Sequence, residues 1–480
     1  MHVTIIGGGI SGLSTAWFLD KQRTDRDEPL KYTLLEASPR LGGKIWTDHQ
    51  DGFLIEGGAD SFVTQKPAAL TLCRALGLGD ELLPCNGQQS TVYILRKGRL
   101  IPLPKGFRIA APTQLWSFLN SPILSLPGKL RVGLEPFISP RKSLEDESLA
   151  AFIERRLGRE MLAGIAGPIM SGIFSTDPER LSMASSFPRF QQLEQEYGSV
   201  IRGMVAEKRK HAGSLSNREP PAMFMGLKSG MGSLVHALSE RVKGAVYTDC
   251  QVTGITRLEH GRFAVDCMRQ NDAQTIMSDA LILAVPARSS APLIRTLQPE
   301  LAEELAAIRY SNTIHAYLGF RAEDLPKGTP PPGFGFVVPP CEGRGIRSCT
   351  FSSIKFPGRA SEGQVLLRAF LSPELQESHV ARPHAEIIDV VKKELNALMG
   401  IQATPILEKV YAYPASNPQY EVGHQDRMDR IDGLAATCPG LHFVGSSFRG
   451  VGIPDIVADA ERVAQQCCAG LTVEPALLPI

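Results

Sequence analysis

The residues with the clearest chemical signature lie near the N-terminus, in the run Gly7-Gly8-Gly9-Ile10-Ser11-Gly12. A short apolar stretch at residues 3–6 precedes them, and residues 13–19 have the composition of a helix. In such a strand–turn–helix unit Gly7 permits the tight turn, Gly9 lets the backbone approach a pyrophosphate, and Gly12 allows close packing of the helix on the sheet. Free N–H groups and the positive dipole end at the helix start favour phosphate binding.

An acidic residue stands where the second strand of this unit should end. The apolar run 32–35 leads into Glu36, 24 residues after Gly12. A carboxylate here can accept hydrogen bonds from ribose hydroxyls, and it disfavours a 2′-phosphate because two negative charges would meet. The stretch from Arg40 to Lys44 resembles one that flavin proteins of the amine-oxidase type carry, in which backbone and a basic side chain meet the cofactor phosphates, and this resemblance favours FAD over NAD. The sequence therefore predicts a dinucleotide site.

Composition excludes several classes of function. The chain has 480 residues with a formal net charge of +1, so no general basic field indicates a nucleic-acid partner. No apolar run of about 18 residues predicts a membrane span, and a first strand at residue 3 leaves no room for a signal or transit peptide. Nine cysteines without a C-x-x-C pair or zinc spacing predict no metal site and favour a reducing cytoplasm.

The pattern of strand and helix signals changes along the chain, which predicts an α/β protein of several parts. Strand signals fade after about residue 102, where proline-punctuated helical stretches begin, and return near 222. The polar, basic stretch 207–222 is predicted to be a loop. The expected parts are a Rossmann-like FAD-binding domain from residues 1–65, 222–292 and 405–475, a mixed α+β substrate-binding domain from 66–101 and 293–404, and a helical insertion at 102–221.

Motifs spread over nearly the whole chain resemble one known family. They include the glycine turn, the 36–44 stretch, Gly58-Ala59-Asp60-Ser61-Phe62, Ser171-Gly172-Ile173, Asn417-Pro418-Gln419-Tyr420 and the run from Gly445 to Asp455. On these motifs the chain resembles the protoporphyrinogen/coproporphyrinogen oxidases, within the amine-oxidase and phytoene-desaturase superfamily of FAD proteins. The first two motifs mark only the superfamily, whereas the last two are more specific to porphyrinogen oxidases.

The resemblance implies a non-covalent FAD and a set of contacts with it. Residues 7–12 would hold the pyrophosphate, and Lys44 would lie near the phosphates, although a solvated loop charge is the alternative for that lysine. The other implied contacts are Glu36 and Ala37 at the ribose, Val252 at the adenine, Gly57, Gly58, Ala59 and Asp60 along the isoalloxazine, Tyr413 beside the ring, and Val451, Gly452 and Ile453 at the pyrimidine end.

The resemblance also implies the reaction. Hydride would leave a meso carbon of a porphyrinogen for the flavin, O2 would reoxidise the flavin to give H2O2, and three rounds would remove six electrons. Eukaryotic members place a substrate-binding arginine where this chain has Val92. That difference favours coproporphyrinogen III as the substrate, with protoporphyrinogen IX second. Amine oxidation, carotenoid desaturation and a non-enzymatic flavin carrier are the rival hypotheses, and no catalytic side chain is assigned.

Carboxylates on such a substrate need cationic partners. Lys66 and Arg96 are the leading candidates, with Phe334 as an aromatic contact for the macrocycle. Further candidates are Lys97, Arg99, Lys105, Phe62, Phe174 and Phe336. A solvated surface is the alternative for each cation and core packing for each aromatic ring, and His315 on an apolar strand is interpreted as a core histidine rather than a base.

The expected partners are the porphyrinogen, O2 and a chelatase of the haem pathway, with the protein a monomer or homodimer in the cytoplasm. The helices of the insertion could instead form a membrane-surface patch. Because their charge is mixed, no more than weak surface association is expected.

Overall fold

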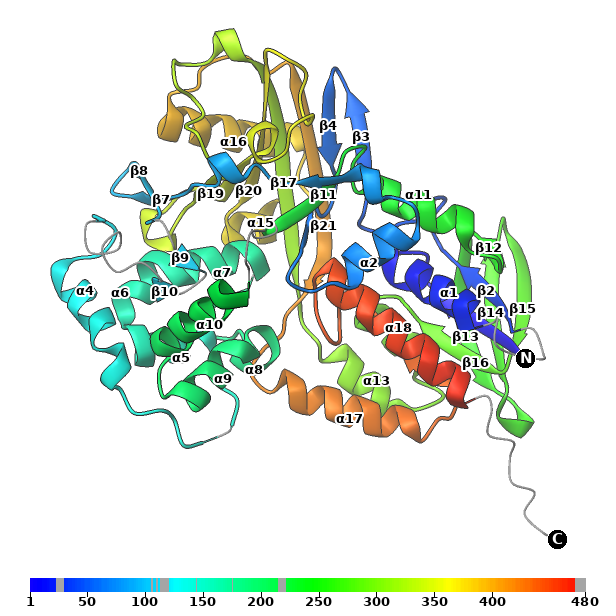
Figure 1. The fold of residues 1–480 in the computed structure, drawn as a ribbon. Coiled ribbons are helices and arrows are strands. Elements are labelled where there is room, and N and C mark those ends of the chain that lie inside the picture. Colours follow the sequence, from blue (N-terminus) through cyan, green and yellow to red (C-terminus); the bar gives the residue numbers. More distant parts are fainter. Residues whose placement is uncertain are drawn as a thin grey trace.

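The computed structural model describes residues 1–22, 30–104, 107–108, 111–112, 121–143, 145–174, 176–214 and 222–470. Figure 1 shows three groups of elements: a sheet with helices near both chain ends, a large sheet, and a group of helices beside it. The α/β fold class is confirmed.

The first group is built on a parallel sheet in the order β12-β2-β1-β16-β22. Its strands are β1 (His2–Ile6), β2 (Lys31–Leu35), β12 (Ala245–Tyr247), β16 (Ala280–Leu283) and β22 (Leu441–Phe443). These are short apolar runs, as expected for strands that are buried on both faces. Three parts of the sequence that lie far apart therefore meet in one sheet.

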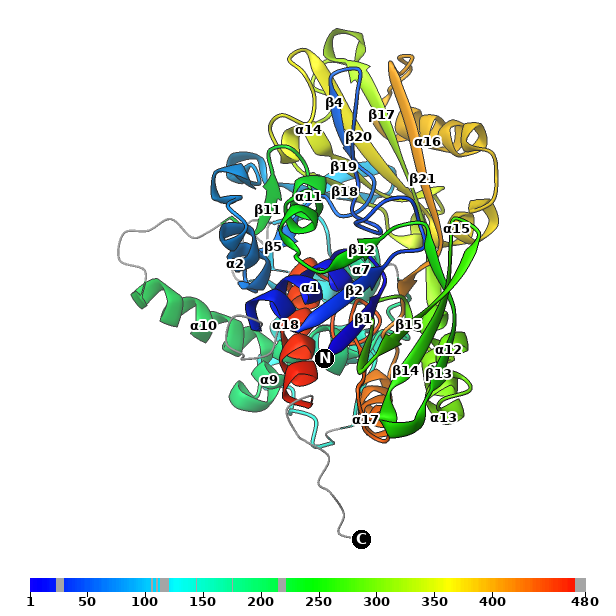
Figure 2. The same ribbon diagram turned by 90° about the vertical axis from the view of Figure 1, so that its right-hand side faces the viewer.

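Each face of this sheet is covered. The helices α1 (Ile10–Gln22), α11 (Gly232–Arg241) and α18 (Ile453–Gly470) form the core on one side. The antiparallel strands β13 (Cys250–Arg257), β14 (Phe263–Arg269) and β15 (Asp272–Ser278) and the helices α12 (Ala287–Ile294), α13 (Pro299–Ala306) and α17 (His424–Ala436) cover the other. Figure 2 shows α18 beside α1 and the three antiparallel strands extending past the parallel sheet.

The second group is a seven-stranded sheet in the order β21-β17-β20-β19-β18-β7-β8. Its strands are β21 (Leu407–Pro418), β17 (Tyr310–Arg321), β20 (Gln364–Leu371), β19 (Ile346–Phe351), β18 (Gly335–Val337), β7 (Val92–Arg96) and β8 (Arg99–Pro102). Alternate residues of β17, such as Ile314 and Ala316, pack against α16 (His384–Met399). The intervening side chains, His315 among them, lie on the opposite face.

Two details bear on the predicted domain boundaries. Strand β21 belongs to the large sheet through its pairing with β17, although residues 405–475 were expected in the FAD-binding domain. Helix α2 (Ala68–Ala75) packs in the core that contains α18, although it falls within the predicted substrate-binding part. The three-part division of the chain otherwise stays a prediction.

The third group consists of the helices of the insertion, cyan and green in Figure 1. They are α4 (Leu126–Gly133), α5 (Leu149–Leu157), α6 (Arg159–Met161), α7 (Gly167–Phe174), α8 (Met183–Ser186), α9 (Pro188–Tyr197) and α10 (Val200–Ser214). The loop prediction for 207–222 was wrong for residues 207–214, which are helical. Arg189 on α9 donates to Glu207 on α10 at 2.8 Å, and this hydrogen bond supports the helix at that position. Among the described residues, none of the helices is both long and apolar enough to span a membrane.

One face of the insertion carries large apolar side chains in solvent. Leu126, Leu130, Leu134 and Phe137 are 72%, 65%, 56% and 78% exposed. The only acidic residue between positions 121 and 143, Glu135, is fully buried. An exposed apolar row with basic neighbours is the surface that weak membrane association would use, and that association stays a prediction.

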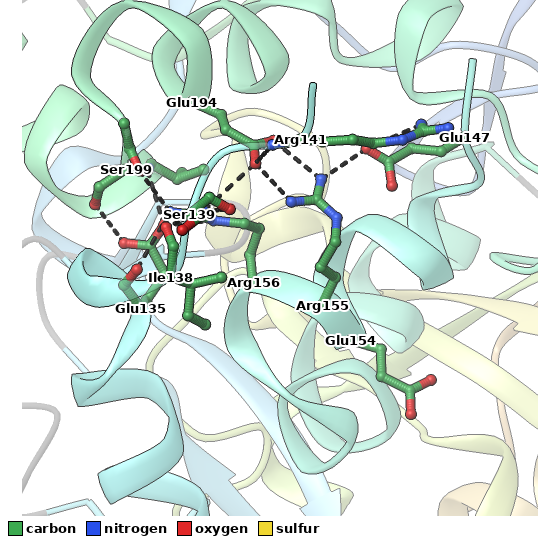
Figure 3. A network of polar contacts seen from close by, with 12 residues as sticks. Glu135, Ile138, Ser139, Arg141, Glu147, Glu154, Arg155, Arg156, Glu194 and Ser199 are labelled. Atoms are coloured by element: carbon green, nitrogen blue, oxygen red, sulfur yellow. Dashed lines mark hydrogen bonds and ion pairs between the residues drawn. The ribbon is translucent and has the colours of Figure 1, made fainter. Parts of the chain in front are cut away.

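Buried charges hold the insertion together (Figure 3). The guanidinium of Arg156 on α5 donates to Glu135 at 2.8 Å through Nε, and neither side chain is exposed. Glu135 also accepts from the backbone N–H of Val200 at 2.9 Å, at the start of α10. Arg156 and its neighbour Arg155 both contact Glu194 on α9. One network of paired charges therefore joins the helices α5, α9 and α10 to the short turn at Glu135–Phe137.

Replacing Arg156 by methionine should destabilise the protein by about 3–5 kcal/mol, because Glu135 would remain charged and buried without its partner. Urea denaturation followed by circular dichroism measures this free energy of unfolding. Arg159→Met is the control, since Arg159 pairs with Glu154 at 2.9 Å but is 85% exposed, and its loss should cost less than about 1 kcal/mol. Equal losses in the two variants would contradict a central role for the network.

Candidate functional site

The glycine turn between β1 and α1 leaves an open backbone surface. Gly7 has a φ of +110°, a conformation that favours glycine. A Cβ at Gly12 would lie 1.9 Å from the Gly7 carbonyl oxygen, so this position tolerates no side chain. A Cβ at Gly9 would meet only Gly43 Cα, at 3.9 Å. Within the described protein, nothing fills the space above Gly9.

The carboxylate of Glu36 lies beside this turn. One oxygen accepts from the Gly8 N–H at 2.7 Å, and the other accepts from the N–H and hydroxyl of Ser38 at 2.8 and 2.7 Å. The oxygen that accepts from Gly8 has a second acceptor site, so a ribose hydroxyl can still be bound there. The N–H of Cys250 donates to the Glu36 carbonyl at 2.9 Å, which brings the start of β13, and with it Val252, to the same end of the site.

Two cations face the other end of the turn. Burial, with repulsion from Arg288 as a second cause, lowers the pKa of Lys44 to about 8. Lys44 donates to the backbone carbonyl of Ser416 at the end of β21. Arg288 lies at the start of α12, where its guanidinium is 5.7 Å from the centre of the Tyr310 ring. Sequence reasoning missed Arg288, because only the fold brings the β16–α12 turn beside Lys44.

The C-terminal glycine loop closes over the same region. A Cβ at Gly445 would lie 3.1 Å from the Ser11 hydroxyl, so the loop passes directly over the start of α1. Gly450, with a φ of +146°, leads through Val451 and Gly452 into α18, which begins at Ile453. The predicted pyrophosphate and pyrimidine contacts thus belong to adjoining backbone segments.

The loop from Gly57 to Asp60 is held by the large sheet. The Tyr413 hydroxyl donates to the Gly57 carbonyl at 2.9 Å, and Arg368 on β20 donates to the Gly58 carbonyl at 2.7 Å. Lys355 on α14 (Ser352–Lys355) donates to the Asp60 carboxylate at 2.8 Å. Nearby positive charge from Lys355 and Arg368 holds the pKa of Asp60 well below its usual value, against the opposing effect of its burial.

His315 lies beneath this loop, and its surroundings favour the core interpretation. Its side chain is 1% exposed, and Nε2 is 3.0 Å from the Arg368 guanidinium, so Nε2 accepts this hydrogen bond. Burial and the positive charge of Arg368 lower the pKa of His315 well below its ordinary value. The ring stacks on Tyr411 at 5.3 Å. A neutral histidine in this place supports the arginine that holds Gly58.

Both leading substrate cations already have carboxylate partners. Lys66 forms an ion pair with Asp455 in the first turn of α18, and Arg96 pairs with Glu160 of the insertion at 3.3 Å. A substrate carboxylate would have to compete with these partners. The role of the two cations, like that of the half-buried Phe334, stays a prediction.

The further candidates fall in different places. Phe62 and Phe336 lie in hydrophobic cores, while Lys97 and Arg99 are exposed at the β7–β8 turn. Lys105 and the side chain of Phe174 lie outside the described residues.

The fold brings together three cations that the sequence prediction missed. Arg368, Lys355 and Arg347 are 6%, 13% and 7% exposed and lie on or near one face of the large sheet. Arg347 and Arg368 both lie over the Phe370 ring, at 5.6 and 4.7 Å. A charged residue within an apolar strand, such as Arg368 in Leu366-Leu367-Arg368-Ala369-Phe370, was the available signal.

These residues fit FAD. Uncovered backbone above Gly9, a carboxylate at Glu36 and the cations Lys44 and Arg288 match a pyrophosphate and a ribose. Bound FAD would supply hydride acceptance, and its place against the loop from Gly57 to Asp60 stays a prediction. The protein would hold the cofactor in position and surround it with charged side chains. In the described part of the chain, His, Cys, Asp and Glu form no group suited to a metal.

Replacing Gly9 by alanine should leave the fold intact and weaken FAD binding at least about tenfold, because the new methyl group meets little protein but occupies the path of the pyrophosphate. Fluorescence titration of the apoprotein with FAD measures the Kd, and circular dichroism checks the fold. Gly79→Ala is the control, since a Cβ there meets nothing within 4 Å. Unchanged affinity in Gly9→Ala would exclude this place for the pyrophosphate.

FAD affinity should fall as the pH rises above about 8. Binding beside a pyrophosphate favours the charged form of Lys44, whose pKa in the free site is about 8, so above this pH binding must take up a proton. Apoprotein titrations between pH 6 and about 9.5 should show a flat Kd at low pH and a rise of up to about tenfold per unit above 8. Lys44→Met should bind more weakly at pH 7 and lose this rise; a persisting rise would assign it to another group.

Comparison with known proteins supports this interpretation of the site. The family model described as "Flavin containing amine oxidoreductase" matches residues 10–468. Coproporphyrinogen III oxidase of Bacillus subtilis (strain 168) is 35% identical over 95% of both chains. Protoporphyrinogen oxidase 1, chloroplastic, of Arabidopsis thaliana is 29% identical over 96% of this chain and 86% of its own.

Solved structures share the fold. A protein of Exiguobacterium sp. 255-15 superposes with a TM-score of 0.83 at 28% identity, covering 98% of this chain and 99% of its own. Putrescine oxidase superposes with a TM-score of 0.67 at 15% identity, which shows the fold alone. Because the family model spans most of the sequence, the chain belongs to the flavin-containing amine oxidoreductase family, and FAD is its cofactor.

Proposed function

We propose that this protein oxidises coproporphyrinogen III to coproporphyrin III. Per molecule of substrate, six electrons and six protons leave the porphyrinogen, and three molecules of O2 become three of H2O2. The observation that carries the proposal is the likeness to bacterial proteins named coproporphyrinogen III oxidase, at 31–35% identity over nearly the whole chain. Protoporphyrinogen IX is the alternative substrate, since plant relatives are named protoporphyrinogen oxidases.

The charges of the site support a substrate with carboxylates. Lys355 and Arg368 contact the Gly57–Asp60 loop, Arg347 lies over the same Phe370 ring as Arg368, and Asp60 is the acid paired with Lys355. An excess of buried positive charge favours anionic groups on a ligand. Because coproporphyrinogen carries four propionates and protoporphyrinogen two, the charges favour the former.

The same charges favour electron transfer to a flavin at this loop. Arg368 and Lys355 would stabilise the negative charge that hydride transfer places on bound FAD. The hydrogen bonds from Tyr413 and Arg368 fix the Gly57 and Gly58 carbonyls, so the loop keeps its position while this charge develops. The Tyr413 and Arg368 side chains would therefore orient the loop and stabilise the developing charge. Protons from the pyrrole N–H groups would leave to solvent, since neutral His315 is buried beneath the loop.

Other parts of the proposal rest on the nature of the reaction. O2 is the proposed electron acceptor, and a chelatase of the haem pathway is the proposed recipient of the product. We place the protein in the cytoplasm as a monomer or homodimer. Amine oxidation and carotenoid desaturation are known on related folds, and no feature of the described residues favours either of them.

Anaerobic mixing of the holoprotein with each porphyrinogen tests the proposal. Coproporphyrinogen III should bleach the flavin absorbance several-fold faster than protoporphyrinogen IX, because its two additional propionates find cationic partners. Stopped-flow absorbance at the flavin band measures both rates, and putrescine serves as the amine control. Faster bleaching by protoporphyrinogen would reverse the choice of substrate, and bleaching by the amine alone would reject porphyrinogen oxidation.

A further inference from the structure

The segment from Tyr420 to His424 lies between the helical insertion and the C-terminal glycine loop. It joins the end of β21 to the start of α17, and its two end side chains are buried, with Tyr420 4% and His424 5% exposed. The reaction proposed above gives this segment no part. Its hydrogen bonds nevertheless point in two directions, toward the loop on one side and toward the insertion on the other.

Side chains of the segment hold the loop from Ser446 to Gly450. The Tyr420 hydroxyl donates to the Ser446 carbonyl at 2.8 Å and accepts from the Gly450 N–H at 2.8 Å. His424 Nε2 lies 2.9 Å from the Phe448 carbonyl and must donate to it, because a carbonyl only accepts. The two rings stack at 4.0 Å with 14° between their planes. Three hydrogen bonds thus hold three alternate residues of the loop, Ser446, Phe448 and Gly450.

Backbone groups of the segment contact the insertion. The Ser182 N–H donates to the Tyr420 carbonyl at 2.8 Å, and the Val422 N–H donates to the Arg180 carbonyl at 2.9 Å. The Asp146 carboxylate accepts from the Gly423 N–H at 3.1 Å and from the Ser182 hydroxyl at 2.6 Å. The segment therefore completes its hydrogen bonds only while the insertion is seated against it.

The loop needs such support for physical reasons. Gly445 and Gly450 have φ values of +129° and +146°, so the loop is built on residues with wide conformational freedom. Ordering such a backbone costs conformational entropy at every residue. Hydrogen bonds that order it before the cofactor arrives remove this cost from binding.

We propose that Tyr420, His424 and Asp146 are positioning residues, which preorganise the flavin-capping loop and make its order depend on the seating of the helical insertion. This inference rests on the proposed placement of the flavin against Val451, Gly452 and Ile453. A disturbance at the insertion would thereby reach the cofactor through these hydrogen bonds.

The Tyr420→Phe holoprotein tests the first half of the inference. This change keeps the ring stack on His424 and removes both hydrogen bonds of the hydroxyl, so the Kd for FAD should rise about 5- to 30-fold. The flavin absorption band should also shift. Tyr32→Phe is the control, because it removes a buried hydroxyl bonded to Asp20 at 2.6 Å, away from the loop.

The comparison is made well below the unfolding temperature of both variants. If Tyr420→Phe loses thermal stability like Tyr32→Phe but keeps the FAD affinity and spectrum of the parent protein, the positioning role is wrong. Gly9→Ala separates this failure from a failure of the proposed site, since it tests the pyrophosphate end independently of the loop.

A double-mutant cycle tests the dependence on the insertion. Asp146→Ala should raise the Kd for FAD about 2- to 10-fold, and combining it with Tyr420→Phe should raise it by less than the product of the single effects, because both act on one network. Asp177→Ala is the control, since Asp177 accepts from Glu179 at 3.0 Å within the insertion. No effect of Asp146→Ala, or a multiplicative effect in the double mutant, would overturn the coupling.

Discussion

The close approach of two backbone segments at Gly7 and Gly12 is the constraint on which the rest of the structure depends. With no room for a Cβ between them, α1 starts directly over the end of β1. The uncovered N–H groups of α1 and the Glu36 carboxylate then share one edge of the parallel sheet. The C-terminal loop reaches this edge because Gly445 fits against Ser11. The positions of all the predicted cofactor contacts in the first group of elements therefore depend on that turn.

The large sheet contributes charged side chains to the predicted site, whereas the first group of elements contributes backbone. Its strands place Arg368 beneath the Gly57–Asp60 loop, and α14 adds Lys355 from the side. Buried cations are costly unless they are hydrogen-bonded. Here the Gly58 carbonyl accepts from Arg368 and the Asp60 carboxylate accepts from Lys355, so the charges of the site also fix its geometry. Removing either partner would disturb both functions together.

The sequence predicts what is local and misses what is assembled by the fold. The turn from Gly7 to Gly12 and the acid Glu36 lie within one strand–helix–strand unit, so their spacing suffices to identify them. The ion pairs of Lys66 with Asp455 and of Arg96 with Glu160 join residues far apart in the chain, and no spacing reveals them.

Segments of polar sequence were misjudged for a related reason. Residues 207–214 looked like a loop by composition, but α10 continues through them and Arg189 of the neighbouring helix pairs with Glu207. The domain boundary near residue 405 was predicted from local changes in the sequence pattern, whereas the position of β21 is set by its pairing with β17. The strand order of the parallel sheet carries a consequence for synthesis on the ribosome. Strand β1 can pair with β16 only after β16 has been translated, and the edge strand β22 follows both in the chain. A nascent chain therefore cannot complete the parallel sheet, or place the Gly445–Asp455 loop beside it, until β22 and this loop have been translated.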